Sequence, residues 1–171
     1  MLNLLCPKEY INSIFEVDLD NLREKGISLL LLDLDNTLVE WHKKEASSEI
    51  VQWFSTAREK GFCLCILSNN SKKRVAEIAD FLEVPFIHKA VKPRRRAFQK
   101  AMELLGYGPE TTGVIGDQIF TDILGGNRLG LYTILVMPLT DKDFVGTKLI
   151  NRQLEKLVLR KLSKKGLLNK K

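Results

Sequence analysis

The sequence predicts a three-layer α/β protein, in which a parallel five-stranded sheet lies between two layers of helices. Short apolar runs alternate with segments of helical periodicity over residues 28–137. The first run, residues 28–34 (SLLLLDL), is continuously apolar, as expected of a strand buried on both faces. Strand–helix alternation at this spacing implies parallel strands joined by right-handed crossovers.

The other elements follow in order along the chain. Four more apolar runs are predicted strands, at residues 62–67, 85–88, 112–115 and 132–137. Four segments with apolar residues at three- and four-residue steps are predicted helices, at residues 46–60, 72–82, 93–105 and 120–129. Gly61, Gly106 and Gly130 end three of these helices, and Pro93 suits the first turn of the third.

Length and composition indicate one globular domain with a separate tail. The chain has 171 residues, 44% of them hydrophobic and 28% charged, which excludes a disordered or fibrous protein. We expect a core over residues 1–147, with an N-terminal extension at 1–27, and a basic amphipathic helix at 148–171. That last segment holds nine basic residues and one acidic residue, so the formal charge of +6 comes from the tail.

The cysteines and the hydropathy indicate the cellular compartment in which the protein works. Cys63 and Cys65 stand two apart in an apolar run, which is neither a redox motif nor a zinc half-site. Buried thiols of this kind are typical of a reducing cytosol. No run approaches the ~20 apolar residues of a membrane span. We therefore expect a cytoplasmic protein, with peripheral contact at the inner face of the membrane as a further hypothesis.

Polar side chains stand where four predicted strands end. Asp33 and Asp35 follow the first strand, and Ser68 and Asn69 follow the second. Lys92 comes just past the third, and the fourth ends at Asp117, with Asp122 five residues on. In parallel sheets ligands bind beyond these strand ends. Converging carboxylates would repel each other, and Mg²⁺ bound by carboxylate and phosphate oxygens resolves the repulsion. The set predicts a phosphate site.

The same residues carry a resemblance to a known family. The order DLDNT, Ser68, Lys92 and GDQIFTD resembles the four motifs of haloacid-dehalogenase-like (HAD) phosphatases. Longer stretches, such as LLDLDNTLVEW and VIGDQIFTDILGGNRLG, resemble the YqeG-type members of subfamily IIIA. The resemblance covers nearly the whole chain and implies the Rossmann-type HAD fold. It also extends to the organellar phosphatases that hydrolyse phosphatidylglycerophosphate.

The resemblance implies a role for each site residue. Asp33 would be the nucleophile that forms an aspartyl-phosphate, and Asp35 the general acid and base. Phosphoryl oxygens would be held by Thr37, Ser68, Asn69 and Lys92, where Thr37 would also lock the loop. Mg²⁺ would be bound by Asp33, the backbone carbonyl of Asp35, and Asp117. Asp122 would bind Mg²⁺ through a water molecule or would hold one of the direct ligands in place.

The spacing of the motifs leaves no room for a cap domain. Only 30 residues separate Thr37 from Ser68, and only 23 separate Ser68 from Lys92. One helix and one strand use most of each interval. We therefore expect an open site, which either accepts a bulky substrate or is closed by a neighbouring subunit.

Three functions remain open. The first is a lipid phosphatase acting on phosphatidylglycerophosphate, with residues 148–171 on an anionic membrane. The second is a phosphatase of a soluble metabolite, completed by contacts in a homo-oligomer. The third is a binding protein for RNA or a ribosomal partner with vestigial catalysis, which the complete motif set disfavours. The basic tail could equally pack on the body of the protein with its charges in solvent.

Overall fold

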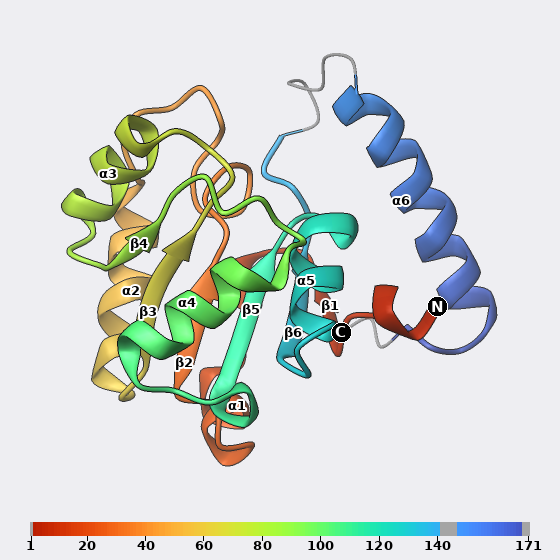
Figure 1. Ribbon diagram of the computed structural model, residues 1–171, viewed down its shortest axis with the longest axis horizontal. Coiled ribbons are helices and arrows are strands. Elements are labelled where there is room, and N and C mark those ends of the chain that lie inside the picture. Colours follow the sequence, from red (N-terminus) through yellow and green to blue (C-terminus); the bar gives the residue numbers. More distant parts are fainter. Residues whose placement is uncertain (1, 141–146, 169–171) are drawn as a thin grey trace.

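The centre of the computed structural model, which describes residues 2–140 and 147–168, is a parallel six-stranded sheet (Figure 1). The strand order is β1-β6-β5-β2-β3-β4, and every neighbouring pair is parallel. The strands are β1 Glu9–Ile11, β2 Leu29–Leu32, β3 Cys63–Leu67, β4 Phe86–Ile87, β5 Thr112–Gly116 and β6 Tyr132–Val136. The predicted α/β class and parallel sheet are confirmed.

The expected number of five strands is wrong, because the N-terminal segment adds β1 at the sheet edge beside β6. A three-residue strand containing a glutamate does not stand out as an apolar run. Glu9 is nevertheless buried, and its carboxylate accepts a hydrogen bond from the Tyr132 hydroxyl at 2.6 Å. Part of segment 1–27, expected as an extension, is therefore integral to the sheet.

Helices cover both faces of the sheet (Figure 1). One face packs against α1 (Leu19–Glu24), α2 (Ser48–Glu59) and α3 (Lys72–Phe81), and the other against α4 (Arg95–Leu105) and α5 (Leu124–Asn127). Successive leucines of β2 serve opposite faces, since Leu30 and Leu32 belong to the first core and Leu29 and Leu31 to the second. This is why the run is continuously apolar.

The segment expected as one helix at 120–129 has a different form. It begins with a π-helical turn, Ile119–Ile123, which continues directly into α5. The wider turn is closed by the Ile123 N–H, which donates to the Gln118 carbonyl at 3.3 Å. Single π turns are rare and often occur at functional sites. This one carries Asp122.

The C-terminal helix α6 (Thr147–Lys164) lies against the π turn at the β1 side of the molecule (Figure 1). Val158 and Leu159 pack on Ile119 and Ile123, and Leu162 is fully buried. The helix therefore has one face on the body of the protein. Within the described residues, no helix is long and apolar enough to cross a membrane.

Gly125 and Gly126 permit close packing of α5. A Cβ atom on Gly125 would lie 2.5 Å from the Phe98 ring of α4, and one on Gly126 would lie 2.7 Å from the Thr133 methyl group of β6. Both neighbours are fully buried and have no room to move. The side chains around both glycines belong to the core, which favours a packing role over close approach of a substrate to the backbone.

We expect the substitution Gly125→Ala to lower the free energy of unfolding by about 1–3 kcal/mol, because the added methyl group overlaps Phe98. Thermal and urea unfolding measure this loss. At a temperature where the variant is folded, its turnover and KM should match the wild type. A large rise in KM without loss of stability would contradict the packing role and favour contact with substrate.

Candidate active site

The site lies where the chain changes direction in the sheet. From β2 the chain builds outward through β3 and β4, then returns to the other side of β2 to form β5 and β6. β2 and β5 are neighbours, with Leu32 opposite Ile115, so Asp33 and Asp117 emerge side by side. The Asp33 N–H extends the ladder by donating to the Ile115 carbonyl at 2.9 Å. Such a crossover point is the usual ligand site of open α/β sheets.

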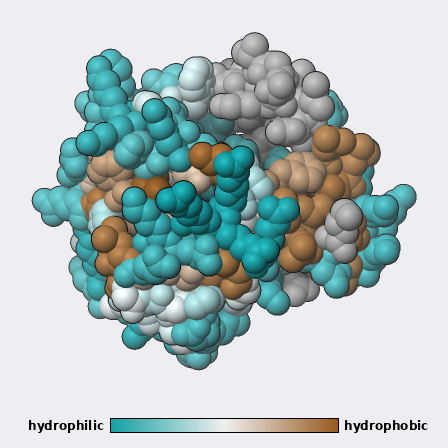
Figure 2. Space-filling view, in the orientation of Figure 1, coloured by the Kyte–Doolittle hydropathy of each residue, from teal (hydrophilic) through white to brown (hydrophobic). Residues whose placement is uncertain are grey.

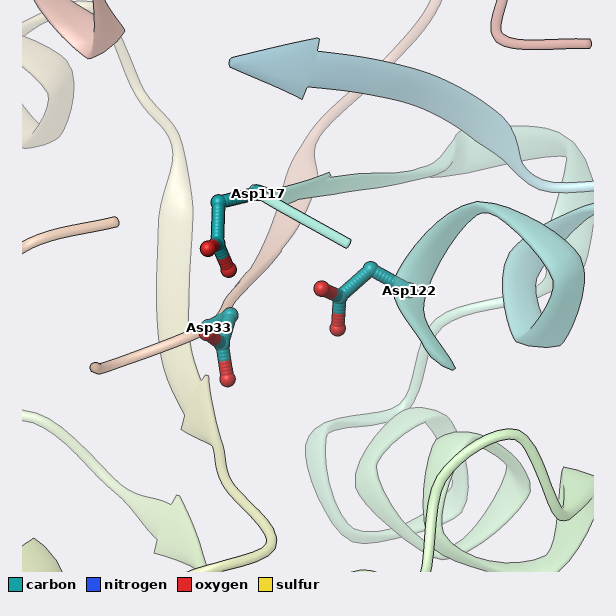
Figure 3. Close-up of side chains that lie close together, drawn as sticks. All are labelled: Asp33, Asp117 and Asp122. Atoms are coloured by element: carbon teal, nitrogen blue, oxygen red, sulfur yellow. The ribbon is translucent and has the colours of Figure 1, made fainter. Parts of the chain in front are cut away.

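Three buried carboxylates converge there. Asp33, Asp117 and Asp122 each place one carboxylate oxygen within 4.8 Å of the other two (Figure 3). Their exposed fractions are 7%, 2% and 1%. Buried carboxylates this close demand a positive charge among them.

Asp122 reaches the cluster from the π turn. Its Oδ2 accepts hydrogen bonds from the Gln118 N–H at 3.2 Å and the Thr121 hydroxyl at 3.3 Å. The strand end beneath it must be glycine, because a Cβ on Gly116 would lie 2.3 Å from the Asp122 carboxyl carbon. The motif glycine therefore makes room for the third carboxylate.

Lys92 supplies a positive charge inside the cluster. Its Nζ lies 2.6 Å from Asp33 Oδ1 and 2.6 Å from Asp122 Oδ1, and the residue is 7% exposed. The Asn69 side chain fixes its backbone, since Asn69 Oδ1 accepts the Lys92 N–H at 2.7 Å and Asn69 Nδ2 donates to the Lys92 carbonyl at 3.4 Å. The preceding Val91 has φ 53°, a strained value for a β-branched residue.

Burial and the mutual charges set the titration of this pair. Burial raises the pKa of Asp33, and the neighbouring Asp122 adds to the rise while Lys92 opposes it. Burial alone would lower the pKa of the Lys92 ammonium, but Asp122 and Asp33 outweigh it and raise the pKa above its usual value. Lys92 therefore stays charged over the physiological range.

A pocket of about 410 Å³ opens above the cluster. Its lining comprises Asp33, Asp35, Trp41, Ser68, Asn69, Asn70, Lys92, Gln118 and Thr121. The intervals between Thr37 and Ser68 and between Ser68 and Lys92 contain only loops, α2, β3, α3 and β4. The expected absence of a cap is thus borne out over these fully described intervals.

Asp35 is held at the pocket wall by two residues that the sequence did not single out. Arg74 of α3 donates from Nε and Nη2 to Asp35 Oδ1 at 3.3 and 3.2 Å, and Asn70 Nδ2 donates to Oδ2 at 3.0 Å. Arg74 also donates to the backbone carbonyls of Glu40 and Lys43. Arg74 stands three residues after Ser71, which caps the N-terminus of α3. The sequence can therefore place Arg74 in the first turn of a helix, but it does not predict the contact with Asp35.

The structure brings together all the residues that the sequence nominated. The pocket lining includes Asp33, Asp35, Ser68, Asn69 and Lys92. Asp117 and Asp122 belong to the carboxylate cluster but not to the lining. Thr37 is absent from the lining: its hydroxyl lies 3.5 Å from Asp33 Oδ2 and 3.4 Å from Asp117 Oδ1. This placement suits the loop-locking role. Hard oxygen donors dominate the cluster, which fits Mg²⁺ rather than a softer metal.

A sequence model of haloacid dehalogenase-like hydrolases matches residues 5–130. The chain belongs to this family, and it is a phosphatase. It is 41% identical to "Probable phosphatase YqeG" of Bacillus subtilis (strain 168) over 160 residues, which cover 94% of this chain and 92% of that protein. The predicted family membership is confirmed.

A more distant relative carries a substrate in its name. "Phosphatidylglycerophosphate phosphatase 1, chloroplastic/mitochondrial" of Arabidopsis thaliana is 26% identical over 181 residues, which span 95% of this chain and 49% of the plant protein.

Solved structures show the same fold. The cobalt-bound deoxy-D-mannose-octulosonate 8-phosphate phosphatase of Haemophilus influenzae superposes with a TM-score of 0.55 at 16% identity, covering 80% of this chain and 89% of that one. An uncharacterized protein from Listeria monocytogenes serotype 4b also reaches 0.55, at 14% identity, covering 78% and 99%.

If Asp35 is the general acid and base that the resemblance implies, we expect Arg74→Ala to lower kcat by about 10- to 100-fold, because Asp35 would lose the side chain that orients it. The loss should be large with alkyl phosphates, whose leaving group needs a proton, and small with p-nitrophenyl phosphate. Steady-state kinetics on both substrates measure the difference.

Arg58→Ala is the matched control. Arg58 also donates to backbone carbonyls, those of Leu82 and Glu83, but it has no contact with Asp35. It should lower stability with no dependence on the leaving group. Equal losses on both substrates in Arg74→Ala would contradict a role through Asp35.

Proposed function

We propose that the protein is a Mg²⁺-dependent phosphomonoesterase that transfers the phosphoryl group to Asp33. The observation that carries this is the convergence of three buried carboxylates and the Lys92 ammonium at the floor of one open pocket. Asp33 lines the pocket, and its carboxylate contacts Lys92 on one oxygen and lies near Thr37 on the other. A nucleophile held at both oxygens is oriented for attack.

Asp33 and Asp117 would bind Mg²⁺ together with the backbone carbonyl of Asp35, and Asp122 would support them. When bound, the ion offsets carboxylate repulsion and the negative charge that develops on the phosphoryl group. Ser68 and Lys92 would hold phosphoryl oxygens. Asn69 acts on Lys92, because its amide already bonds both backbone groups of that residue.

Two steps complete the reaction. A carboxylate oxygen of Asp33 attacks phosphorus, the bond from phosphorus to the ester oxygen breaks, and the protonated Asp35 carboxyl gives its proton to the departing alcohol. A water molecule then attacks the phosphorus of the aspartyl-phosphate. Asp35 takes a proton from this water, and inorganic phosphate leaves with Asp33 restored as a carboxylate.

For the substrate we propose phosphatidylglycerophosphate, presented on an anionic membrane. The plant relative of that name and the open, capless pocket support this assignment. The exposed side of α6 supports it too: Leu154 and Leu157 are 46% and 58% exposed, and the side chains around them include Lys156, Arg160, Lys161, Lys164 and Lys165. Figure 2 shows hydrophobic surface in the region of α6. Such a helix inserts leucines while its lysines bind anionic lipid.

We expect Asp33→Asn to lower turnover by at least about 1,000-fold with the fold intact, because the amide cannot form the acyl phosphate. Phosphate release from a monoester panel, with Mg²⁺ and with a chelator, measures this together with circular dichroism. Asp80→Asn, an exposed aspartate on α3, is the matched control and should remain active. Substantial activity of Asp33→Asn, or of the wild type in chelator, would overturn the mechanism.

We expect full-length protein to float with vesicles that contain anionic lipid and to hydrolyse phosphatidylglycerophosphate in them faster than soluble monoesters. The double substitution Leu154→Ser, Leu157→Ser should weaken vesicle binding by roughly 10-fold per leucine, since each loses most of its apolar burial.

Leu104→Ser, which removes a leucine that is 64% exposed on α4, is the matched control and should bind vesicles normally. Absence of vesicle binding together with rapid hydrolysis of a soluble monoester would contradict the lipid substrate. Such a result would favour the soluble-metabolite phosphatase.

A further inference from the structure

The one acidic residue in the basic segment 148–171 is buried. Glu155 is 5% exposed, whereas its neighbours Leu154 and Lys156 face solvent. A carboxylate is rarely this buried unless hydrogen bonds or charges compensate its lost hydration. The position of Glu155 therefore needs a specific partner in the body of the protein.

That partner is the first residue of the π turn. Glu155 Oε1 accepts the Ile119 N–H at 2.8 Å. The first N–H groups of a helix have no partner within it, and the side chain of the local cap residue Gln118 accepts no hydrogen bond from these backbone groups. Glu155 thus caps the turn from a helix 36 residues away in the chain. A carboxylate is the favoured charge at a helix N-terminus.

The capped turn and the two residues before it carry two of the three clustered carboxylates. Asp117 stands two residues before Ile119, and Asp122 stands within the turn. The Gln118 N–H and the Thr121 hydroxyl fix Asp122 Oδ2, and Asp122 Oδ1 contacts Lys92. Val158 and Leu159 of α6 pack against the apolar cluster that Ile119 and Ile123 of this turn form with Leu135. The geometry of the cluster therefore depends on where α6 holds this turn.

We propose that Glu155 is a positioning residue for residues 117–123, which we call the metal-binding loop, so that α6 completes the active site as well as carrying basic charge. The proposal rests on the proposed function, because it assigns Asp117 and Asp122 to the Mg²⁺ site. It follows that deletion of 148–171 removes a support of the site, and loss of activity on deletion is not a measure of membrane binding.

The test compares Glu155→Ala, Glu155→Gln and Leu162→Ala in the full-length chain. Leu162 is a fully buried residue of α6 without a hydrogen bond to the turn, so its variant reports the general effect of weakened docking. Calorimetry measures the Kd for Mg²⁺ alone, thermal unfolding measures stability, and hydrogen exchange without metal measures the order of residues 117–123.

We expect Glu155→Ala to weaken Mg²⁺ binding about 10-fold and to speed exchange at 117–123, with Glu155→Gln between it and the wild type because the amide retains an acceptor oxygen. Leu162→Ala should lower Tm at least as much while changing the Kd less than twofold.

Unchanged Kd and unchanged exchange at 117–123 in Glu155→Ala, with normal Mg²⁺ binding by the wild type, would overturn the positioning role and leave the proposed function standing. Absence of Mg²⁺ binding by the wild type would overturn the proposed function, and exchange at 117–123 would still decide whether Glu155 orders the turn.

Discussion

The repulsion between three buried carboxylates is the constraint on which the rest of the structure depends. Two unit charges at 4 Å interact by roughly 4 kcal/mol at an effective dielectric of about 20. One carboxylate oxygen from each of Asp33, Asp117 and Asp122 lies within 4.8 Å of the other two, and the Lys92 ammonium contacts Asp33 and Asp122. The folded chain tolerates this arrangement because the sheet fixes β2 beside β5 and the π turn fixes Asp122. A divalent cation would neutralise the remaining negative charge and allow an anionic phosphoryl group to approach.

Side chains from two helices, α3 and α6, hold the residues around this cluster in position. Arg74 ties Asp35 to α3 and to the loop that carries Glu40 and Lys43. Glu155 ties the proposed metal-binding loop to α6. Arg74 hydrogen-bonds a side chain of the pocket, and Glu155 hydrogen-bonds the backbone of the turn that carries Asp122. Residues outside a site can orient its side chains in this way without contacting the ligand. We therefore propose two roles for α6: one face holds the loop, and the exposed leucines and lysines on the other side would contact a membrane surface.

The sequence predicted what depends on local pattern and failed where long-range contacts decide. The leucine run of β2, and the motif residues after β2, β3 and β5, are readable because burial on both faces and polar strand ends leave clear patterns. β1 was missed because three residues with one glutamate give no apolar run. Arg74 and Glu155 were missed because an arginine at the start of a helix and a glutamate in a basic helix are usually surface residues. Only the folded structure shows that their side chains contact Asp35 and Ile119. The π turn was missed because its spacing differs from an α-helix by a single residue.

The most direct test of the central claim is acid quench of the working enzyme followed by mass spectrometry of its peptides. A single turnover with excess enzyme, in Mg²⁺ and with a phosphomonoester, should place one phosphoryl group on the peptide containing Asp33, with fragmentation locating it on that side chain. Omission of Mg²⁺ should abolish the adduct. Burst release of phosphate with no phosphorylated peptide, or a phosphoryl group on any other residue, would contradict the account.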